Sequence, residues 1–245
     1  MDLPEHYPAY SAELIRTIVT VAHFDLNKLR DLVAPHPQLV KASWDWGFGD
    51  WETPLGAACH MGRRDIAEYL LSLGSVPTLF SAILFGELST VREALEKSPA
   101  LARVSGPHSI SLLAHARTAG QPSREVMSYL ESLGDADIEK PVPLGEEDKN
   151  SICGSYRFGG DSSQVVTVSG DMATYAHTPM YTLPPQLNWT RAGTISRPLF
   201  HMGQRQFYPA GAPSVRIAFE IAEKATVMKI ADGETVLEAA RVDRV

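Results

Sequence analysis

Three of the four tryptophans of this 245-residue chain lie in residues 44–52, WDWGFGDWE, beside three carboxylates and two glycines. Aromatic side chains in a glycine-bearing loop are good anchors for a partner, because each offers a large contact area and loses little rotamer entropy. We therefore predict a partner-binding surface made of Trp44, Asp45, Trp46, Phe48, Asp50, Trp51, Glu52, His60 and His115. In the alternative interpretation, Trp44 and Trp46 fold back as a cap on the neighbouring helices, and the two histidines are buried and hydrogen-bonded.

A second group of aromatic, imidazole and cationic side chains lies in the C-terminal half. It consists of Tyr175, His177, Tyr181, Trp189, Arg191, Arg197 and His201. Such a set suits a small anionic or aromatic ligand, and histidine and arginine can also supply acid–base and oxyanion chemistry. If the protein is an enzyme, we expect its catalytic residues to be Tyr175, His177, Arg191 and His201. The alternative is a domain whose interior is filled by its own side chains, with no cavity.

The common catalytic and cofactor motifs are missing from the sequence. It contains no Walker A loop, no Gly-x-Gly-x-x-Gly, no Gly-x-Ser-x-Gly, no His-Glu-x-x-His and no Cys-x-x-Cys. The two cysteines, Cys59 and Cys153, cannot build a disulfide framework or a four-cysteine zinc site. The sequence therefore predicts neither a cofactor nor a metal, and any function must come from a surface or a pocket.

Residues 10–137 have the pattern of paired short amphipathic helices. The second helices of the pairs are predicted over residues 26–33, 64–74, 89–98 and 124–134. Each carries apolar residues at i, i+3 and i+4 spacing, as Ile66, Tyr69 and Leu70 illustrate. Because such short helices are not stable alone, the repetition predicts a helical solenoid in which each pair packs on its neighbours.

The most regular repeat, residues 52–74, resembles the ankyrin repeat. Its Thr53-Pro54-Leu55 motif stands where the ankyrin threonine and proline begin the first helix. Gly56 departs from the pattern, since it replaces the usual histidine after the leucine. The resemblance covers roughly half of the chain. It implies a concave face with protruding loops that binds a protein partner, and residues 44–52 would lie in such a loop.

The second half alternates with the period of β-strands. Strands are predicted over residues 164–168, 173–177, 187–191, 197–201, 215–221, 225–230 and 235–242. In the clearest one, Val215, Ile217, Phe219 and Ile221 face one side of the strand. Glycine-containing turns between the strands favour an antiparallel meander that closes into a small barrel.

This half looks like the small lipocalin-like domain appended to many bacterial serine beta-lactamase-related proteins. The resemblance depends on the segments ICGSYRF, VVTV, WTRAGTI and RPLF. No Ser-x-x-Lys or Tyr-x-Asn occurs in the chain, so the acyl-serine chemistry of those proteins is not implied. Residues 177–185 depart from the family's tight hairpin and are expected to cover one mouth of the barrel.

We predict an α+β multidomain protein with an ankyrin-repeat domain in residues 1–137, a linker in 138–150 and a barrel in 151–245. The linker prediction is based on its prolines, glycine and charges. The net charge of −7 argues against a nucleic-acid or lipid footprint. The first residues do not resemble an export signal, and no apolar run is long enough to span a membrane, so we expect a cytoplasmic protein.

The functional prediction is a non-catalytic binding protein. A protein partner would bind the ankyrin face, and the barrel would serve as a second recognition module. The alternative is a cofactor-free enzyme, such as a cyclase, isomerase or hydrolase of a small metabolite, with its pocket in the barrel or at the domain junction. A small-molecule carrier would use the same pocket without chemistry.

Overall fold

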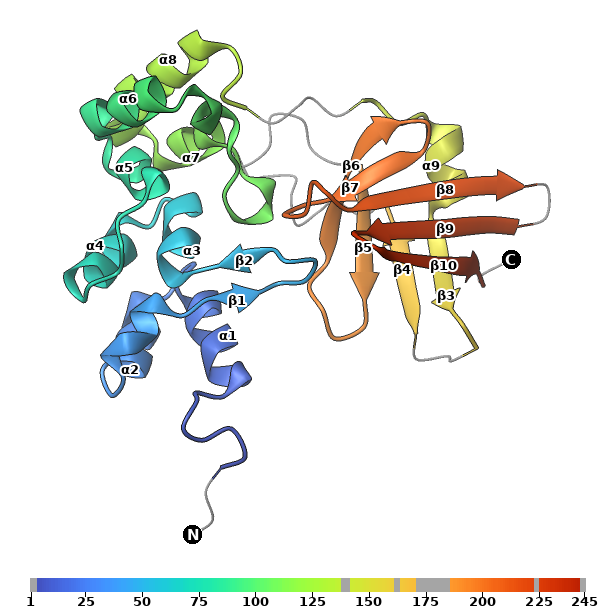
Figure 1. The fold of residues 1–245 in the computed structure, drawn as a ribbon, viewed down its shortest axis with the longest axis horizontal. Helices are drawn as coiled ribbons and strands as arrows, with labels where there is room; N and C mark the ends of the chain where they lie inside the picture. Colours follow the sequence, from blue (N-terminus) through green and yellow to red (C-terminus); the bar gives the residue numbers. More distant parts are fainter. Residues whose placement is uncertain (1–3, 138–141, 161–163, 171–185, 223–224, 243–245) are drawn as a thin grey trace. The chain divides into compact units, whose positions relative to one another are not determined.

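The computed structural model of the protein describes residues 4–137, 142–160, 164–170, 186–222 and 225–242. The chain divides into two compact units, residues 1–138 (unit 1) and 139–245 (unit 2). In Figure 1, unit 1 is drawn in blue to green and unit 2 in yellow to red. The described part of unit 1 is mainly helical and that of unit 2 contains a closed barrel, so the prediction of a mixed helical and β protein is confirmed.

Unit 1 consists of helix pairs with a short hairpin before the second pair. The helices are α1 (Ala12–Val21), α2 (Leu26–Val33), α3 (Pro54–His60), α4 (Arg64–Ser72), α5 (Leu79–Phe85), α6 (Leu88–Lys97), α7 (Leu112–Ala119) and α8 (Arg124–Leu133). The 3-10 helices are η1 (Pro37–Lys41), η2 (Pro99–Arg103), η3 (Pro107–Ser109) and η4 (Gln121–Ser123). The hairpin strands are β1 (Trp44–Asp45) and β2 (Trp51–Glu52).

Local sequence signals explain where these helices begin and end. The Thr53 hydroxyl accepts a hydrogen bond from the Gly56 N–H at 3.0 Å, which satisfies a free donor at the start of α3. The Ser111 hydroxyl caps α7 in the same way. Helix α5 ends at Gly86, whose φ of +73° a side chain would disfavour.

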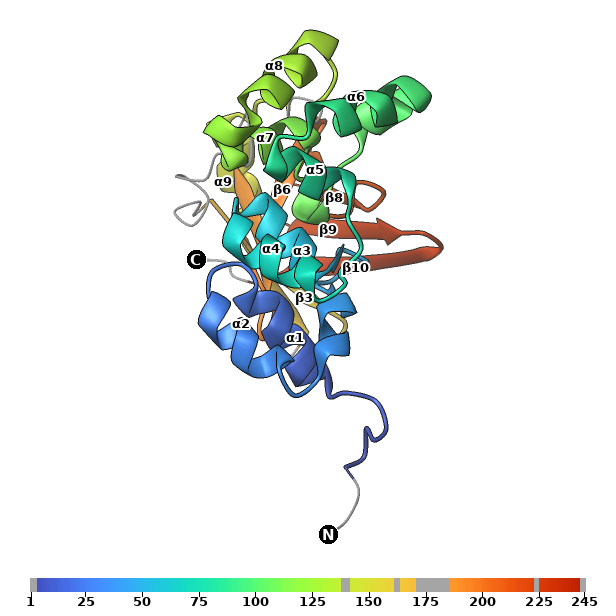
Figure 2. The ribbon, with the colours of Figure 1, turned by 90° about the vertical axis from the view of Figure 1, so that its left-hand side faces the viewer.

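The first helices of the pairs form one row. Helices α1, α3, α5 and α7 contact one another in succession, and each contacts the helix that follows it in the chain (Figures 1 and 2). Six side chains of the predicted apolar stripes of the second helices are buried, at 0–4% exposure. They are Ile66, Leu70, Val91, Leu95, Val126 and Leu130. The prediction of amphipathic helices in this half of the chain is therefore confirmed.

Unit 2 is a short helix followed by an eight-stranded antiparallel barrel. Its elements are α9 (Glu146–Ile152), β3 (Gly154–Phe158), β4 (Val165–Ser169), β5 (Leu187–Arg191), β6 (Arg197–Gly203), β7 (Gln206–Pro209), β8 (Arg216–Ala222), β9 (Ala225–Asp232) and β10 (Thr235–Arg241). Neighbours in sequence pair with each other from β3 to β10, and β10 pairs back with β3 to close the sheet. A closed meander leaves no free edge strand.

Alternating side chains fill the barrel interior, which includes Tyr156, Phe207, Ile217 and Met228 at no more than 1% exposure. The predicted strand over residues 173–177 lies outside the described residues. The last residues of the predicted linker over 138–150 belong to α9, a polar, charge-rich segment of about two helical turns. Among the helices that the structure describes, none is long and apolar enough to cross a membrane.

Candidate metal centre

Four side chains from separate elements of unit 1 meet in one place, and we call them the His₃Glu cluster. His23 follows α1, Glu52 ends β2, His60 ends α3, and His108 lies in η3. One potential ligand atom from each side chain lies within 4.8 Å of the others. The cluster thus combines three imidazole rings and one carboxylate, which are common ligands of transition-metal ions.

Glu52 lies at the centre of the His₃Glu cluster and is 1% exposed. One carboxylate oxygen, Oε1, lies 2.8 Å from His60 Nε2. The other, Oε2, lies 3.4 Å from His23 Nε2 and 3.6 Å from His108 Nε2, and accepts a 2.7 Å hydrogen bond from the Trp46 indole. Burial acts to raise the Glu52 pKa, but the His108 and His60 rings outweigh burial and hold this pKa well below its ordinary value. The carboxylate is therefore ionised.

Hydrogen-bond acceptors fix the orientation of two of the three rings. His23 Nδ1 lies 2.9 Å from Val19 O and 3.1 Å from Thr20 O, and since a carbonyl oxygen only accepts, Nδ1 carries the proton. His108 Nδ1 lies 2.7 Å from the carboxylate oxygen Oδ2 of Asp50, so it also carries a proton. In both rings, the Nε2 atom is therefore the one that faces the centre of the cluster. Metal-binding histidines commonly have this arrangement.

Asp50 holds His108 in an unusual backbone conformation. His108 and Ser109 both have φ of +60°, a left-handed conformation that costs a residue with a side chain about 1–2 kcal/mol. The Asp50 carboxylate is buried and accepts hydrogen bonds from both the backbone N–H (2.9 Å) and Nδ1 (2.7 Å) of His108. Burial acts to lower the His108 pKa, but Asp50 and Glu52 raise it to about 9. Backbone strain of this kind persists where several surrounding contacts hold the residue in place, often at functional sites.

A fourth imidazole, His115, is buried beside the His₃Glu cluster. Its ring centroid lies 6.4 Å from that of His60, and its Nδ1 lies 2.8 Å from Ser111 O. Burial lowers the pKa of His115 to about 3 and also lowers that of His60. Within the described residues, His115 Nε2 and His60 Nδ1 are buried and have no hydrogen-bond partner.

The predicted partner-binding residues have different environments in the structure. Asp50, Glu52, His60 and His115 are at most 3% exposed, so they do not belong to an exposed surface, because their polar groups bond within the unit. Trp44, Asp45, Trp46 and Phe48 are partly buried, and Trp51 is 61% exposed. Trp46 follows the alternative interpretation, since its indole packs near His23 and His108 and donates to Glu52.

Sequence reasoning did not single out two members of the cluster, His23 and His108. His23 lies in a turn after α1, and His108 lies 58 residues from Asp50, the carboxylate that orients it. Neither belongs to a short ligand motif such as two histidines on one helix face. The absence of such a motif led to the expectation of no metal, and that expectation used only spacing along the chain.

The predicted barrel pocket is only partly within the described residues. Tyr175, His177 and Tyr181 lie outside them. Trp189 and Arg197 are buried and face each other across β5 and β6, with Arg197 Nη1 2.7 Å from Ala210 O. Arg191 is exposed and bonds to Gln164, and His201 is partly buried with Nδ1 2.9 Å from Val142 O. These contacts are internal to unit 2 and define no reaction centre.

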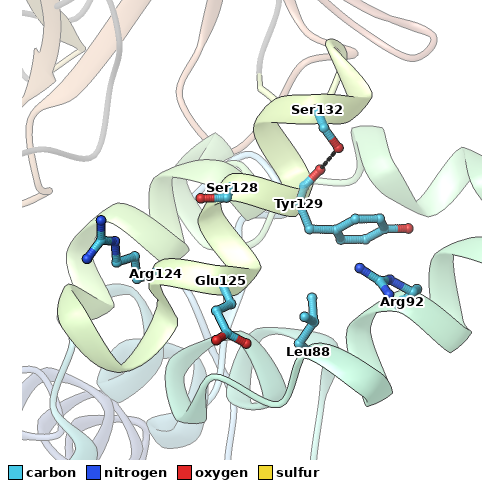
Figure 3. Close-up of a pocket in the computed structure, with 7 residues that line it drawn as sticks. All are labelled: Leu88, Arg92, Arg124, Glu125, Ser128, Tyr129 and Ser132. Carbon is cyan, nitrogen blue, oxygen red and sulfur yellow. Dashed lines mark hydrogen bonds between the residues drawn. The ribbon is translucent and has the colours of Figure 1, made fainter.

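An open groove of about 520 Å³ lies between α6 and α8. Figure 3 shows the residues that line it, which are Leu88, Arg92, Arg124, Glu125, Ser128, Tyr129 and Ser132. Arg92 lies over the Tyr129 ring, 5.0 Å from its centroid, and Arg124 lies at the far end of the groove. The groove contains no histidine or cysteine, and its charged groups do not converge on one point. The His₃Glu cluster is therefore the stronger candidate site.

No family model matches the chain, and no curated protein matches it. Its function has therefore to be inferred from the geometry of the His₃Glu cluster.

Proposed function

We propose that unit 1 binds one divalent transition-metal ion through His23, Glu52, His60 and His108. The observation that carries the proposal is the convergence of three Nε2 atoms on one buried carboxylate. The three rings come from different segments of the chain, and each has its Nε2 toward Glu52. That orientation lets all three rings bind one ion, whereas a buried histidine that serves only the core is satisfied by any hydrogen-bond partner.

The fixed tautomers make a cation favourable at the centre. In the neutral form of His23, Nδ1 carries the ring proton and Nε2 presents a lone pair. That lone pair faces an ionised Glu52 oxygen at 3.4 Å. Two electron-rich atoms at this distance repel each other unless a proton or a metal ion lies between them. A divalent ion would convert the same contact into two coordinate bonds.

The distances are close to those of a four-coordinate site. With metal–ligand bonds of about 2.0–2.1 Å, two ligand atoms of a tetrahedron lie about 3.3 Å apart. Glu52 Oε2 lies close to this distance from two Nε2 atoms, 3.4 Å from that of His23 and 3.6 Å from that of His108, while His60 Nε2 lies 2.8 Å from the other oxygen, Oε1. Small side-chain adjustments would therefore suffice. Imidazole-rich sites favour Zn²⁺, Co²⁺, Ni²⁺ or Cu²⁺ over the oxygen-preferring Mg²⁺ and Ca²⁺.

A bound ion would act as a Lewis acid and as a cross-link between the helix pairs that supply its ligands. The side chains of His23 and His108 are 18% and 19% exposed, while that of Glu52 is fully buried. Solvent would therefore approach the ion from the side of these two histidines. The chain itself would supply three imidazoles and one carboxylate as ligands. Asp50 bonds to His108 and the Trp46 indole donates to Glu52, so both support the ligands.

Zinc titration of the whole protein by calorimetry, with a competing chelator, tests the proposal. We expect one Zn²⁺ per chain in the wild type and a loss of at least about tenfold in affinity for Glu52→Gln and His108→Gln. His36→Gln removes an exposed histidine outside the cluster and should bind like the wild type. Circular dichroism of each variant shows whether it folds. A wild type that takes up no zinc, or three variants with equal affinity, would overturn the proposal.

A second candidate function keeps the protein-binding hypothesis. We propose that unit 1 is an ankyrin-type array, supported by the cap of Thr53 before Pro54-Leu55, and that unit 2 is lipocalin-like, supported by its closed eight-stranded barrel. The observation that favours a partner is Trp51, an aromatic side chain 61% exposed in the hairpin. Native mass spectrometry of the protein from its own source tests this. We expect a bound protein in the wild type that Trp51→Ala no longer retains, and equal masses for both would reject the assignment.

A further inference from the structure

We infer that His115 is a positioning residue of the metal site, and that it accepts the His60 Nδ1 proton through one bridging water. The inference deepens the proposed function and rests on it. It assigns a role to a buried imidazole outside the His₃Glu cluster. It also explains how the third ring is held with Nε2 toward the ion.

The first step concerns the tautomer that His60 needs. To bind a metal, Nε2 must offer a lone pair, so the ring proton must be on Nδ1. His60 is 2% exposed, and within the described residues its Nδ1 has no hydrogen-bond partner. The equivalent atoms of His23 and His108 do have acceptors, namely backbone carbonyls and Asp50. A metal-binding His60 therefore needs an acceptor that it does not contact directly.

The second step identifies His115 as an acceptor of the correct kind. Its Nδ1 lies 2.8 Å from Ser111 O, a carbonyl oxygen, so Nδ1 carries the proton and Nε2 has the lone pair. His115 is 1% exposed, and its Nε2 has no partner in the described part of the chain. With a metal on its Nε2, His60 would present a buried Nδ1 donor, and His115 presents a buried Nε2 acceptor on the adjacent ring.

The third step is the separation of the two rings. Helices α3 and α7, which carry His60 and His115, contact each other, and the ring centroids lie 6.4 Å apart with planes at 88°. The two nitrogens make no direct hydrogen bond with each other, and we infer that one water bridges them. Phe80 fixes the His115 ring by packing against it at 4.5 Å. Gly106 also lies close to that ring, since a Cβ there would lie 3.1 Å from Cε1 and 3.4 Å from Nε2.

Cobalt substitution with variants of His115 provides the test. His115→Phe keeps a flat ring against Phe80 but removes the acceptor, and His115→Gln offers a new acceptor. We expect Co²⁺ and Zn²⁺ to bind His115→Phe about 10–100-fold more weakly than the wild type, with partial recovery in His115→Gln. The unfolding midpoint of the metal-free protein should change little in His115→Phe. The variant loses the Nδ1 bond to Ser111 O, but that carbonyl still accepts the His115 backbone N–H, and the variant also removes a buried polar atom without a partner.

Proton NMR of the cobalt-loaded protein distinguishes a positioning role of His115 from a merely structural one. Each ligating ring should show one exchangeable Nδ1–H signal shifted by the paramagnetic ion. We expect three such signals in the wild type and faster solvent exchange of the His60 signal alone in His115→Phe. Binding within twofold of the wild type, with three unchanged signals, would overturn the role of His115. A wild type that binds no metal would instead overturn the proposed function, and this inference with it.

Discussion

Replacing Asp50 by asparagine should weaken metal binding by changing how His108 is held. The aspartate accepts two hydrogen bonds from His108, one from the backbone N–H at 2.9 Å and one from Nδ1 at 2.7 Å. An asparagine has only one acceptor oxygen, and its amide group donates. Either the backbone contact is lost, or the ring proton moves to Nε2, the atom that must bind the metal.

The magnitude of this effect follows from the loss of one orienting partner. Removing a hydrogen-bond partner of a metal ligand typically weakens binding about 10–100-fold, or about 1.4–2.7 kcal/mol. In the metal-free protein, one charge-assisted hydrogen bond should be lost, which costs about 1.5–3 kcal/mol. The left-handed conformation of His108 and Ser109 would also lose part of its support.

The assay is zinc calorimetry together with urea unfolding of the metal-free protein. Asp45→Asn is the matched control, because Asp45 lies in the same hairpin and accepts a 2.8 Å hydrogen bond from the Gly47 N–H outside the cluster. We expect Asp45→Asn to bind zinc like the wild type. Equal zinc affinity in Asp50→Asn and Asp45→Asn would refute the role of Asp50 in orienting His108.

Three further predictions concern the scaffold that positions the cluster. Gly86→Ala should destabilise unit 1 by about 1–3 kcal/mol more than Gly74→Ala. Both glycines have positive φ, but of the two only Gly86 has a carbonyl, that of Pro122, where a Cβ would lie. Equal losses of stability on urea unfolding would contradict that close approach. Thr53→Ala should lower the unfolding free energy by about 1 kcal/mol through the lost α3 cap, and should leave zinc stoichiometry at the wild-type value. Leu70→Ala should cost about 2–5 kcal/mol by thermal or urea unfolding, since the side chain is fully buried, and a loss near zero would show that its core can collapse.

Much of the secondary structure could be predicted because its signals are local. The predicted helix over residues 26–33 and the predicted strand over 187–191 have the bounds seen for α2 and β5. Helix α4 and its buried Ile66 and Leu70 follow from i, i+3 and i+4 spacing. Strand alternation likewise placed Val215, Ile217, Phe219 and Ile221 on one face. The first three are buried, whereas Ile221 is 37% exposed. Period and capping depend on neighbours within a few residues, so the chain specifies them directly.

The α9 helix illustrates a weaker local signal. Residues 146–152 begin with three acidic side chains, which favour a helix N-terminus, but two prolines and a glycine precede them. The sequence predicted a linker there because prolines, a glycine and clustered charges resist both helix and strand hydrogen bonding. In the structure, Ile152 at the end of α9 is buried, and its carbonyl accepts a hydrogen bond from the Tyr156 hydroxyl. A contact with the barrel thus decides the conformation of this segment.

The sequence alone determined that this protein has an amphipathic helical half and an alternating β half, because both periods are properties of consecutive residues. The tertiary structure decided which polar side chains are buried together. Glu52 and His60 lie eight residues apart, and Asp50 and His108 lie 58 apart, so only helix packing brings them into contact. Glu52 is typical of a surface carboxylate by sequence and becomes a buried centre only because three imidazoles and an indole surround it.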